Sequence, residues 1–189
     1  MIRTENFAMV DADTAADLHD WLRANHGQAA SVWLVTAKKT DAARFIPRAQ
    51  VLDALIAWGW IDGIMRKRDD GRTMQLISPR KMQVWAKTYQ DRVARLRQDS
   101  RMEAPGEAAV QAAQAAGLWN ALAHVDRLEV PEDLAAALGP VGPQFASLPP
   151  SYRRNVLRWI AGAKTPPTRA KRVAELVART ATGERVPQY

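Results

Sequence analysis

The sequence predicts an α+β protein, with a β-hairpin and a short sheet in its N-terminal part and a helical bundle in its C-terminal part. Strand-like apolar runs occur only before residue 102, and beyond it the apolar residues recur at helical spacing. We therefore expect an α+β domain over residues 1–101 and an all-helical region over 102–189 that packs on it.

Three elements are predicted ahead of the hairpin. Leu18 and Leu22 recur at helical spacing and predict a helix over about 14–26. The run SVWLVTA at 31–37 is short, apolar and β-branched, which is typical of a buried strand. Pro47 fits the first turn of a second helix.

A β-hairpin is the clearest local pattern. Strand-like runs at 60–67 and 72–78 are separated by a segment that contains Asp70-Gly71, a dipeptide typical of hairpin turns. From about residue 82 the spacing becomes helical again, with Trp85 on the apolar face.

Prolines precede or open the helices predicted for the C-terminal part. Pro105, Pro131, Pro150 and Pro166 each stand at the start of a periodic apolar segment, where Pro is favoured. The segment 139–150, rich in Pro and Gly, is predicted to be a loop.

The chain is basic, and its charge is unevenly distributed. Its 189 residues include 27 Lys and Arg and 20 Asp and Glu, a net charge of +7. Residues 66–101 hold eleven basic and four acidic residues, and 151–189 hold nine and two. Between them, 102–150 holds one basic and six acidic residues. Two basic blocks therefore suit an acidic partner, such as a small anion, an acidic protein or a lipid head group.

Several chemistries have no support in the sequence. The absence of Cys excludes disulfides and thiolate chemistry, and the three His show no metal-ligand spacing. No phosphate-binding glycine loop or nucleophile elbow is present, so we expect no cofactor and favour a non-enzymatic protein. No apolar stretch predicts a transmembrane segment or a secretory signal, which indicates a cytoplasmic location.

Asp62 is unusual because it lies inside a predicted strand, where acidic residues are depleted. It is a weak catalytic candidate, since burial beside a tryptophan would raise its pKa and suit it to act as a base. It could instead orient Arg66 or Arg80, and the favoured interpretation is a structural pairing with an arginine across the hairpin.

The residues expected to contact an anionic ligand lie mainly on the hairpin and its flanks. Arg169 and Arg172 stand in the first turns of the last predicted helix, where the helix dipole favours acidic side chains, so an anion there would offset the misfit. A solvent-facing position or pairing with the acidic segment is the alternative. The full set of candidates is Lys38, Trp60, Asp62, Arg66, Arg80, Lys81, Trp85, Arg169 and Arg172.

Four blocks carry a family resemblance: WGWIDG (58–63), ISPRK (77–81), Trp85, and SYRRNVLRWIAGAKTPPTRAKRV (151–173). Together they resemble the YdeI/OmdA family of bacteriocin-protection or outer-membrane-porin-associated proteins, over most of the chain from near Trp21. The resemblance implies resistance to cationic antimicrobial peptides or bacteriocins, a suggested periplasmic location, and no established catalysis.

Three functions remain open at this point. The first is a non-enzymatic binding or stress-protection protein that engages an anionic ligand or acidic partner through the hairpin cations and a tryptophan. The second is nucleic-acid binding along the two basic blocks, without a recognised motif. The third is an enzyme with Asp62 as acid or base and Arg80 as its electrostatic partner.

Overall fold

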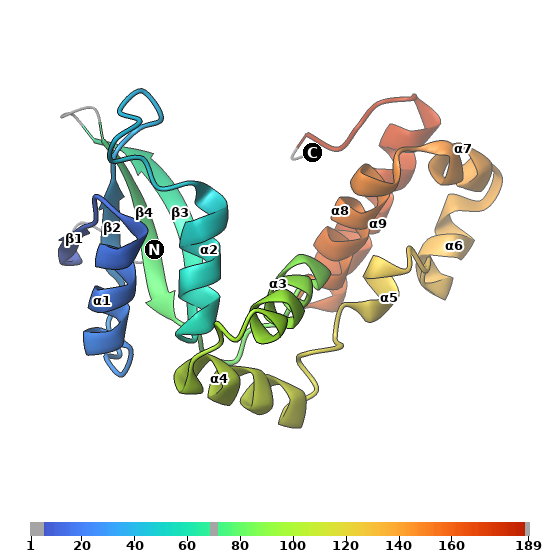
Figure 1. Ribbon diagram of the computed structural model, residues 1–189. Helices are drawn as coiled ribbons and strands as arrows, with labels where there is room; N and C mark the ends of the chain where they lie inside the picture. Colours follow the sequence, from blue (N-terminus) through green and yellow to red (C-terminus); the bar gives the residue numbers. More distant parts are fainter. Residues whose placement is uncertain (1–5, 69–71, 188–189) are drawn as a thin grey trace. The chain divides into compact units, whose positions relative to one another are not determined.

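The structure is a computed structural model that describes residues 6–68 and 72–187. The chain divides into two compact units, Met1–Asn120 and Ala121–Tyr189. The first unit combines a four-stranded mixed sheet with helices, and the second unit is helical (Figure 1). The predicted α+β class is confirmed.

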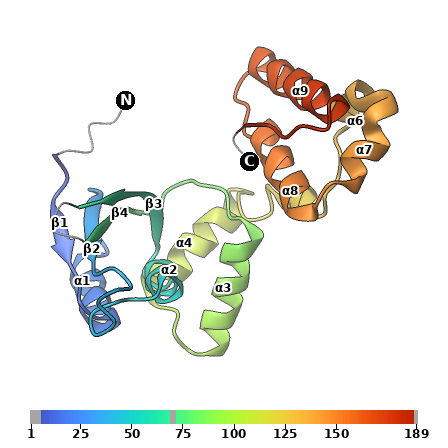
Figure 2. The same ribbon diagram turned by 90° about the horizontal axis from the view of Figure 1, so that it is seen from above.

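The sheet of the first unit has the strand order β1-β2-β4-β3. β1 (Met9–Asp11) runs parallel to β2 (Val32–Thr36), while β2 and β3 (Trp60–Lys67) each pair antiparallel with β4 (Thr73–Pro79). β1 and β3 are therefore the two edges of the sheet, which the view in Figure 2 shows.

Three of these strands agree with the sequence prediction. β1 was not predicted, because a strand of three residues is too short to show an alternating pattern. The predicted turn at Asp70-Gly71 lies outside the residues that the structure describes.

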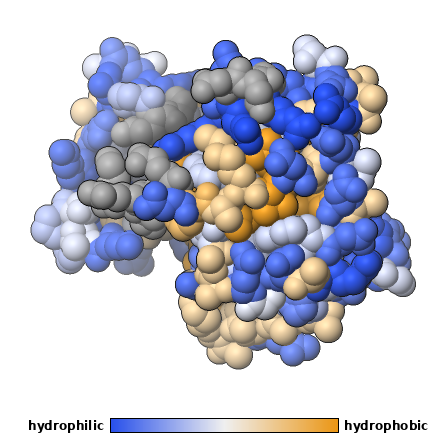
Figure 3. Space-filling view, turned by 90° about the vertical axis from the view of Figure 1, so that its left-hand side faces the viewer, coloured by the Kyte–Doolittle hydropathy of each residue, from blue (hydrophilic) through white to orange (hydrophobic). Residues whose placement is uncertain are grey.

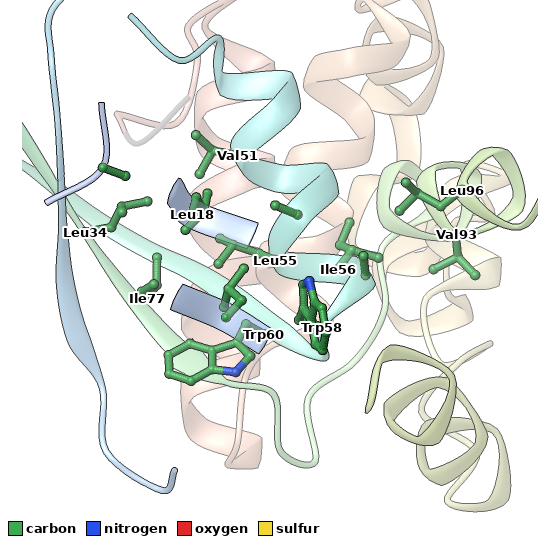
Figure 4. Close-up of a cluster of buried hydrophobic side chains, with 14 of the residues drawn as sticks. Leu18, Leu34, Val51, Leu55, Ile56, Trp58, Trp60, Ile77, Val93 and Leu96 are labelled. Carbon is green, nitrogen blue, oxygen red and sulfur yellow. The ribbon is translucent and has the colours of Figure 1, made fainter. Parts of the chain in front are cut away.

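Two helices cover one face of the sheet (Figure 1). α1 (Ala15–Asn25) begins with a capping box, in which Thr14 and Asp17 each accept a hydrogen bond from the other's backbone N–H. α2 (Arg48–Ala57) is buried along most of its length. Their apolar side chains meet those of the sheet in the core drawn in Figure 4, which includes Leu18, Leu34, Leu55, Trp60 and Ile77.

α3 (Lys87–Gln98) and α4 (Ala104–Ala115) pack on α2 and complete the first unit. The boundary between the units therefore falls at Asn120, later than the expected end of the first domain at residue 101. α3 also begins later than the predicted start near residue 82. Trp85 lies in a non-helical segment, and its backbone N–H donates to the Leu118 carbonyl oxygen at 3.2 Å.

A buried carboxylate ties α2 to α3. Arg95 Nη2 donates to both oxygens of Asp53, at 2.6 and 2.7 Å, and Arg92 Nη1 donates to Oδ1 at 2.6 Å. Asp53 is buried, so loss of both arginines would leave a charge that solvent does not compensate. The basic character of α3 therefore serves packing within the first unit.

The second unit is built from short and medium helices around its own core. The prediction of a loop at 139–150 is wrong, because Pro140 and Pro143 open a 3-10 turn and a short helix, where the missing N–H of Pro costs little. Phe145 and Leu134 are fully buried in this core. The elements are α5 (Ala123–Asp126), α6 (Glu132–Leu138), the 3-10 turn η2 (Gly139–Val141), α7 (Gly142–Ser147), α8 (Pro150–Ala161) and α9 (Pro166–Ala181).

The surface mixes polar and apolar regions. On the face drawn in Figure 3, hydrophobic atoms gather near the centre and hydrophilic side chains surround them. Within residues 6–68 and 72–187, none of the helices has both the length and the apolar character that crossing a bilayer requires. Large apolar side chains that remain exposed are Met9, Ile64, Met65, Met82 and Val84.

Replacing Gly106 by Ala should destabilise the protein. Gly106 lies in α4 against the carbonyl oxygen of Ala57 at the end of α2, and an added Cβ would overlap that oxygen. Helix propensity alone favours Ala by about 1 kcal/mol. The steric overlap should outweigh this preference. We therefore expect urea unfolding to show that Gly106→Ala lowers the free energy of unfolding by about 1–3 kcal/mol. Gly142→Ala, where a Cβ meets open space, is the control and should not destabilise.

His19 should make stability fall in mild acid. Trp58 Nε1 donates to His19 Nδ1 at 3.2 Å, and burial, aided by Arg101, lowers the pKa of His19 below 6.5. The unfolded chain therefore binds a proton more readily, so this stabilisation is complete above pH 6.5 and declines as pH falls toward the lowered pKa. Urea unfolding between pH 7.5 and 5.5 should show a weaker decline for His19→Gln than for the control His124→Gln. Equal declines would contradict the assignment.

Candidate functional site

A pocket of about 200 Å³ lies where the C-terminal end of β2 and the facing parts of β3 and β4 meet the start of α2. Phe45, Ile46 and Val51 supply apolar surface, and Thr36 and Thr73 supply hydroxyl groups. The remaining lining residues are Ala37, Lys38, Lys39, Arg48, Met65 and Gln75. The pocket therefore combines apolar walls with hydrogen-bonding groups and cations.

Three cations, Lys38, Lys39 and Arg48, border this pocket. The side chains of Lys38 and Lys39 form no hydrogen bond or ion pair within the described part of the chain, and no Asp or Glu lines the pocket. Arg48 is largely exposed, with 67% of its side-chain surface accessible. Lys67 pairs with Thr73 in the sheet register, which places it on the same face as the pocket. The potential here favours a negatively charged group.

Asp62 adjoins the pocket and joins three elements. Its side chain is only 8% exposed. Tyr89 Oη of α3 donates to Oδ1, Gln75 Nε2 of β4 donates to Oδ2 at 3.3 Å, and Arg48 Nη2 of α2 lies 3.5 Å from Oδ2. Since Arg48 and Gln75 also line the pocket, the carboxylate connects the pocket to α3.

Tyr89 holds its proton firmly in this arrangement. Burial, together with the hydrogen bond to Asp62 and the charge of that carboxylate, raises the pKa of Tyr89 to about 12. The tyrosine is therefore a hydrogen-bond donor at neutral pH. With donors on both of its oxygens, Asp62 acts as a hydrogen-bond acceptor that joins β3 to β4 and α3.

Arg80 is stacked inside the first unit. Its guanidinium carbon lies 3.7 Å from the centroid of the Trp85 ring and 5.2 Å from that of Tyr89. Nη2 donates to the Val84 carbonyl oxygen at 3.0 Å, whereas Nε and Nη1 are buried without a hydrogen-bond partner. Burial lowers the pKa of Arg80 to about 10, which leaves it charged at neutral pH.

The other candidates from the hairpin region lie apart from the pocket. Trp60 is fully buried and its Nε1 donates to the His26 carbonyl oxygen at 3.3 Å, so it is a core residue. Arg66 is exposed and lies over the Trp33 ring at 5.4 Å. Lys81 is exposed. Of the residues named from the sequence, only Lys38 lines the pocket.

Arg169 and Arg172 are engaged within the second unit. Arg169 donates to both oxygens of Asp133, at 2.7 and 2.8 Å, and this contact lowers the pKa of that carboxyl group. Arg172 donates to the Trp159 carbonyl oxygen and lies over the Trp159 ring at 5.2 Å. Their position near the start of α9 is thus compensated by contacts inside the unit.

Arginine and lysine side chains differ in the contacts that they make. Among the residues described, all arginines except Arg101 have a hydrogen bond, ion pair or ring contact through their side chains. The lysines, apart from Lys87, have none. Most arginine side chains therefore make contacts within their own unit, whereas the lysine side chains other than Lys87 face solvent without such contacts.

Sequence reasoning missed most of the pocket. Phe45, Arg48, Met65 and Gln75 come from a loop, a helix and two strands, and no spacing rule connects them. The one usable signal was the pair of lysines directly after a buried strand. Nor does any group of three His, Cys, Asp or Glu side chains in the described ranges offer a metal site.

Fold and site define an α+β protein with a basic pocket beside a mixed sheet and a separate helical unit. Residues 10–109 match a family described as a domain of unknown function (DUF8412), and residues 127–183 match one described as Bacteriocin-protection, YdeI or OmpD-Associated. The first match covers more than half of the chain, so the chain belongs to the DUF8412 family, and its C-terminal part carries an OmdA region. No curated protein and no solved structure matches the chain.

The resemblance to YdeI/OmdA is therefore confirmed for the C-terminal unit. The OmdA match covers less of the chain than the resemblance implied. Two of the four sequence blocks, WGWIDG at 58–63 and ISPRK at 77–81, lie in the part matched by DUF8412. The pocket belongs to that part as well.

Tyr89→Phe should destabilise the first unit. The change removes the donor to a buried carboxylate, and hydrogen bonds to charged groups contribute about 1.5–3 kcal/mol. Urea unfolding should show that the free energy of unfolding falls by an amount in that range. Tyr152→Phe, which removes only a neutral contact with the Val186 backbone N–H, should cost about 1 kcal/mol.

A second measurement identifies the same tyrosine. Absorbance during alkaline titration should show one phenol that ionises near pH 12, and that step should disappear in Tyr89→Phe. Its persistence in the variant would contradict the assignment.

Proposed function

We propose that this chain is a non-enzymatic binding protein whose ligand is a small anion with an apolar part, held in the pocket beside α2. One observation carries the proposal: Lys38, Lys39 and Arg48 line a partly apolar pocket that no acidic side chain lines. A charged head would meet the cations while an apolar group contacts Phe45 and Val51.

The size of the pocket limits the ligand. A volume of about 200 Å³ is below the roughly 300–1,000 Å³ of pockets that hold drug-sized molecules. The cations are at the rim and remain hydrated, so their attraction to an anion is screened by salt. Binding should therefore be modest in strength and should weaken as ionic strength rises.

The description of the OmdA family, bacteriocin protection, fits a binding role in stress protection without chemistry. Nucleic-acid binding along a basic stripe has less support, because Arg169 and Arg172 are occupied by Asp133 and Trp159. Catalysis by Asp62 has less support, because Tyr89 and Gln75 occupy its oxygens.

The double variant Lys38→Glu/Lys39→Glu should lose affinity for an anionic probe by at least about tenfold, since attraction becomes repulsion at the pocket. Phenyl phosphate serves as the probe in isothermal titration calorimetry, and benzyl alcohol serves as the neutral comparison. We expect the wild-type chain to bind phenyl phosphate more tightly than benzyl alcohol, with an affinity that falls between 20 and 300 mM KCl.

Lys164→Glu/Lys171→Glu is the matched control, because it makes the same change of charge at two exposed lysines of the second unit. It should leave binding at the wild-type level. Equal losses in the two double variants would show that net charge, and not the pocket, attracts the probe.

A further inference from the structure

β3 is an edge of the sheet, and no strand formed by residues 6–68 or 72–187 lies on its outer side (Figure 2). Its residues 63–67 are all exposed, and Ile64 and Met65 have exposed fractions of 50% and 53%. An edge strand carries backbone N–H and C=O groups that can pair with a further strand. Exposed apolar residues on such an edge are unusual, because proteins normally protect edges from pairing.

The sequence of β3 limits which strand can pair with it. Arg66 and Lys67 follow the two apolar residues, and the side chain of Lys67 has no ion-pair or hydrogen-bond partner among the residues described. The register with β4 shifts between Asp62 and Met65, so the regular part of the edge begins at Met65. The two cations oppose pairing with another basic edge, including β3 of a second copy, and favour pairing with an acidic strand.

The edge also adjoins the basic pocket. Met65 belongs to β3 and lines the pocket, and it pairs with Gln75 on the face of the sheet that α2 covers. A strand added beside β3 would lie about 4.8 Å away, and its residue opposite Met65 would point to the same face. That side chain would lie beside Met65, where β3 lines the pocket, on the face of the sheet that also carries Lys67.

We propose that the pocket's natural ligand is an acidic side chain of an extended peptide that adds to β3 as a fifth strand. In this mode, main-chain hydrogen bonds provide affinity and the pocket selects the side chain. The inference rests on the proposed function, because it uses the same cations, and it adds the edge as a second contact surface.

The experiment measures fluorescence anisotropy of a fluorescein-labelled octapeptide that alternates Glu and Val. A second octapeptide has the same side chains, with every backbone amide N-methylated so that it keeps its charge and loses its donors. The first should bind at least about tenfold more tightly than the second. Equal affinities would overturn strand addition, because charge alone would then explain binding.

Two double variants locate the contact. Ile64→Glu/Arg66→Glu places acidic side chains on the edge, outside the pocket. It should lower the affinity for the octapeptide at least about tenfold and leave the affinity for phenyl phosphate unchanged. Lys81→Glu/Met82→Glu makes the same changes of charge and polarity at exposed residues away from β3 and should change neither affinity. Equal effects of both variants on the octapeptide would overturn the proposal.

These measurements distinguish the proposal of an anion-binding pocket from the proposal of strand addition. Phenyl phosphate binding that depends on Lys38 and Lys39, combined with no octapeptide binding, would refute strand addition and leave the pocket intact. If Lys38→Glu/Lys39→Glu left the affinity for the octapeptide unchanged, the pocket would not bind an acidic side chain of the peptide. Sedimentation velocity at increasing concentration tests the competing occupant, since a dimer that Ile64→Glu/Arg66→Glu dissolves would assign the edge to a second copy.

Discussion

The carboxylate of Asp62 is the constraint on which the site depends. A buried charge costs several kcal/mol unless polar groups surround it, so donors from α2, β4 and α3 must stay within reach of its two oxygens. Meeting that requirement fixes where Arg48 and Gln75 lie, and these residues form part of the pocket wall. The same contacts hold α3 against the sheet, and the pair of arginines on Asp53 secures α3 on α2.

The +7 charge of the chain therefore has two roles. In the first basic block, the arginines of α3 bind Asp53 and Glu107, and Arg80 is stacked on Trp85. In the second, Arg169 binds Asp133. What remains for a partner is a smaller set of lysines, of which Lys38 and Lys39 lie at the pocket.

Local patterns predicted most of the helices and most of the sheet, because alternation, capping and Pro positions act within a few residues. They failed where tertiary contacts decide: Trp85 precedes α3 because its backbone pairs with Leu118, and 139–150 folds into helical turns over a buried Phe145. The candidate site was harder still, since its walls come from elements that only folding brings together. Lys38 was predicted from its place after a strand, whereas Arg80 was named for its charge and is stacked, half-buried, on Trp85.

The division between arginine and lysine has a chemical consequence. Guanidinium groups resist acylation under conditions in which exposed amines react, and acetylation removes the charge of a lysine. Acetylating the folded chain would thus neutralise the exposed lysines, Lys38 and Lys39 at the pocket among them, while the arginine pairs that support the fold keep their charge. The anion binding that we propose for the pocket is in this sense a property that covalent modification could reduce without unfolding the protein.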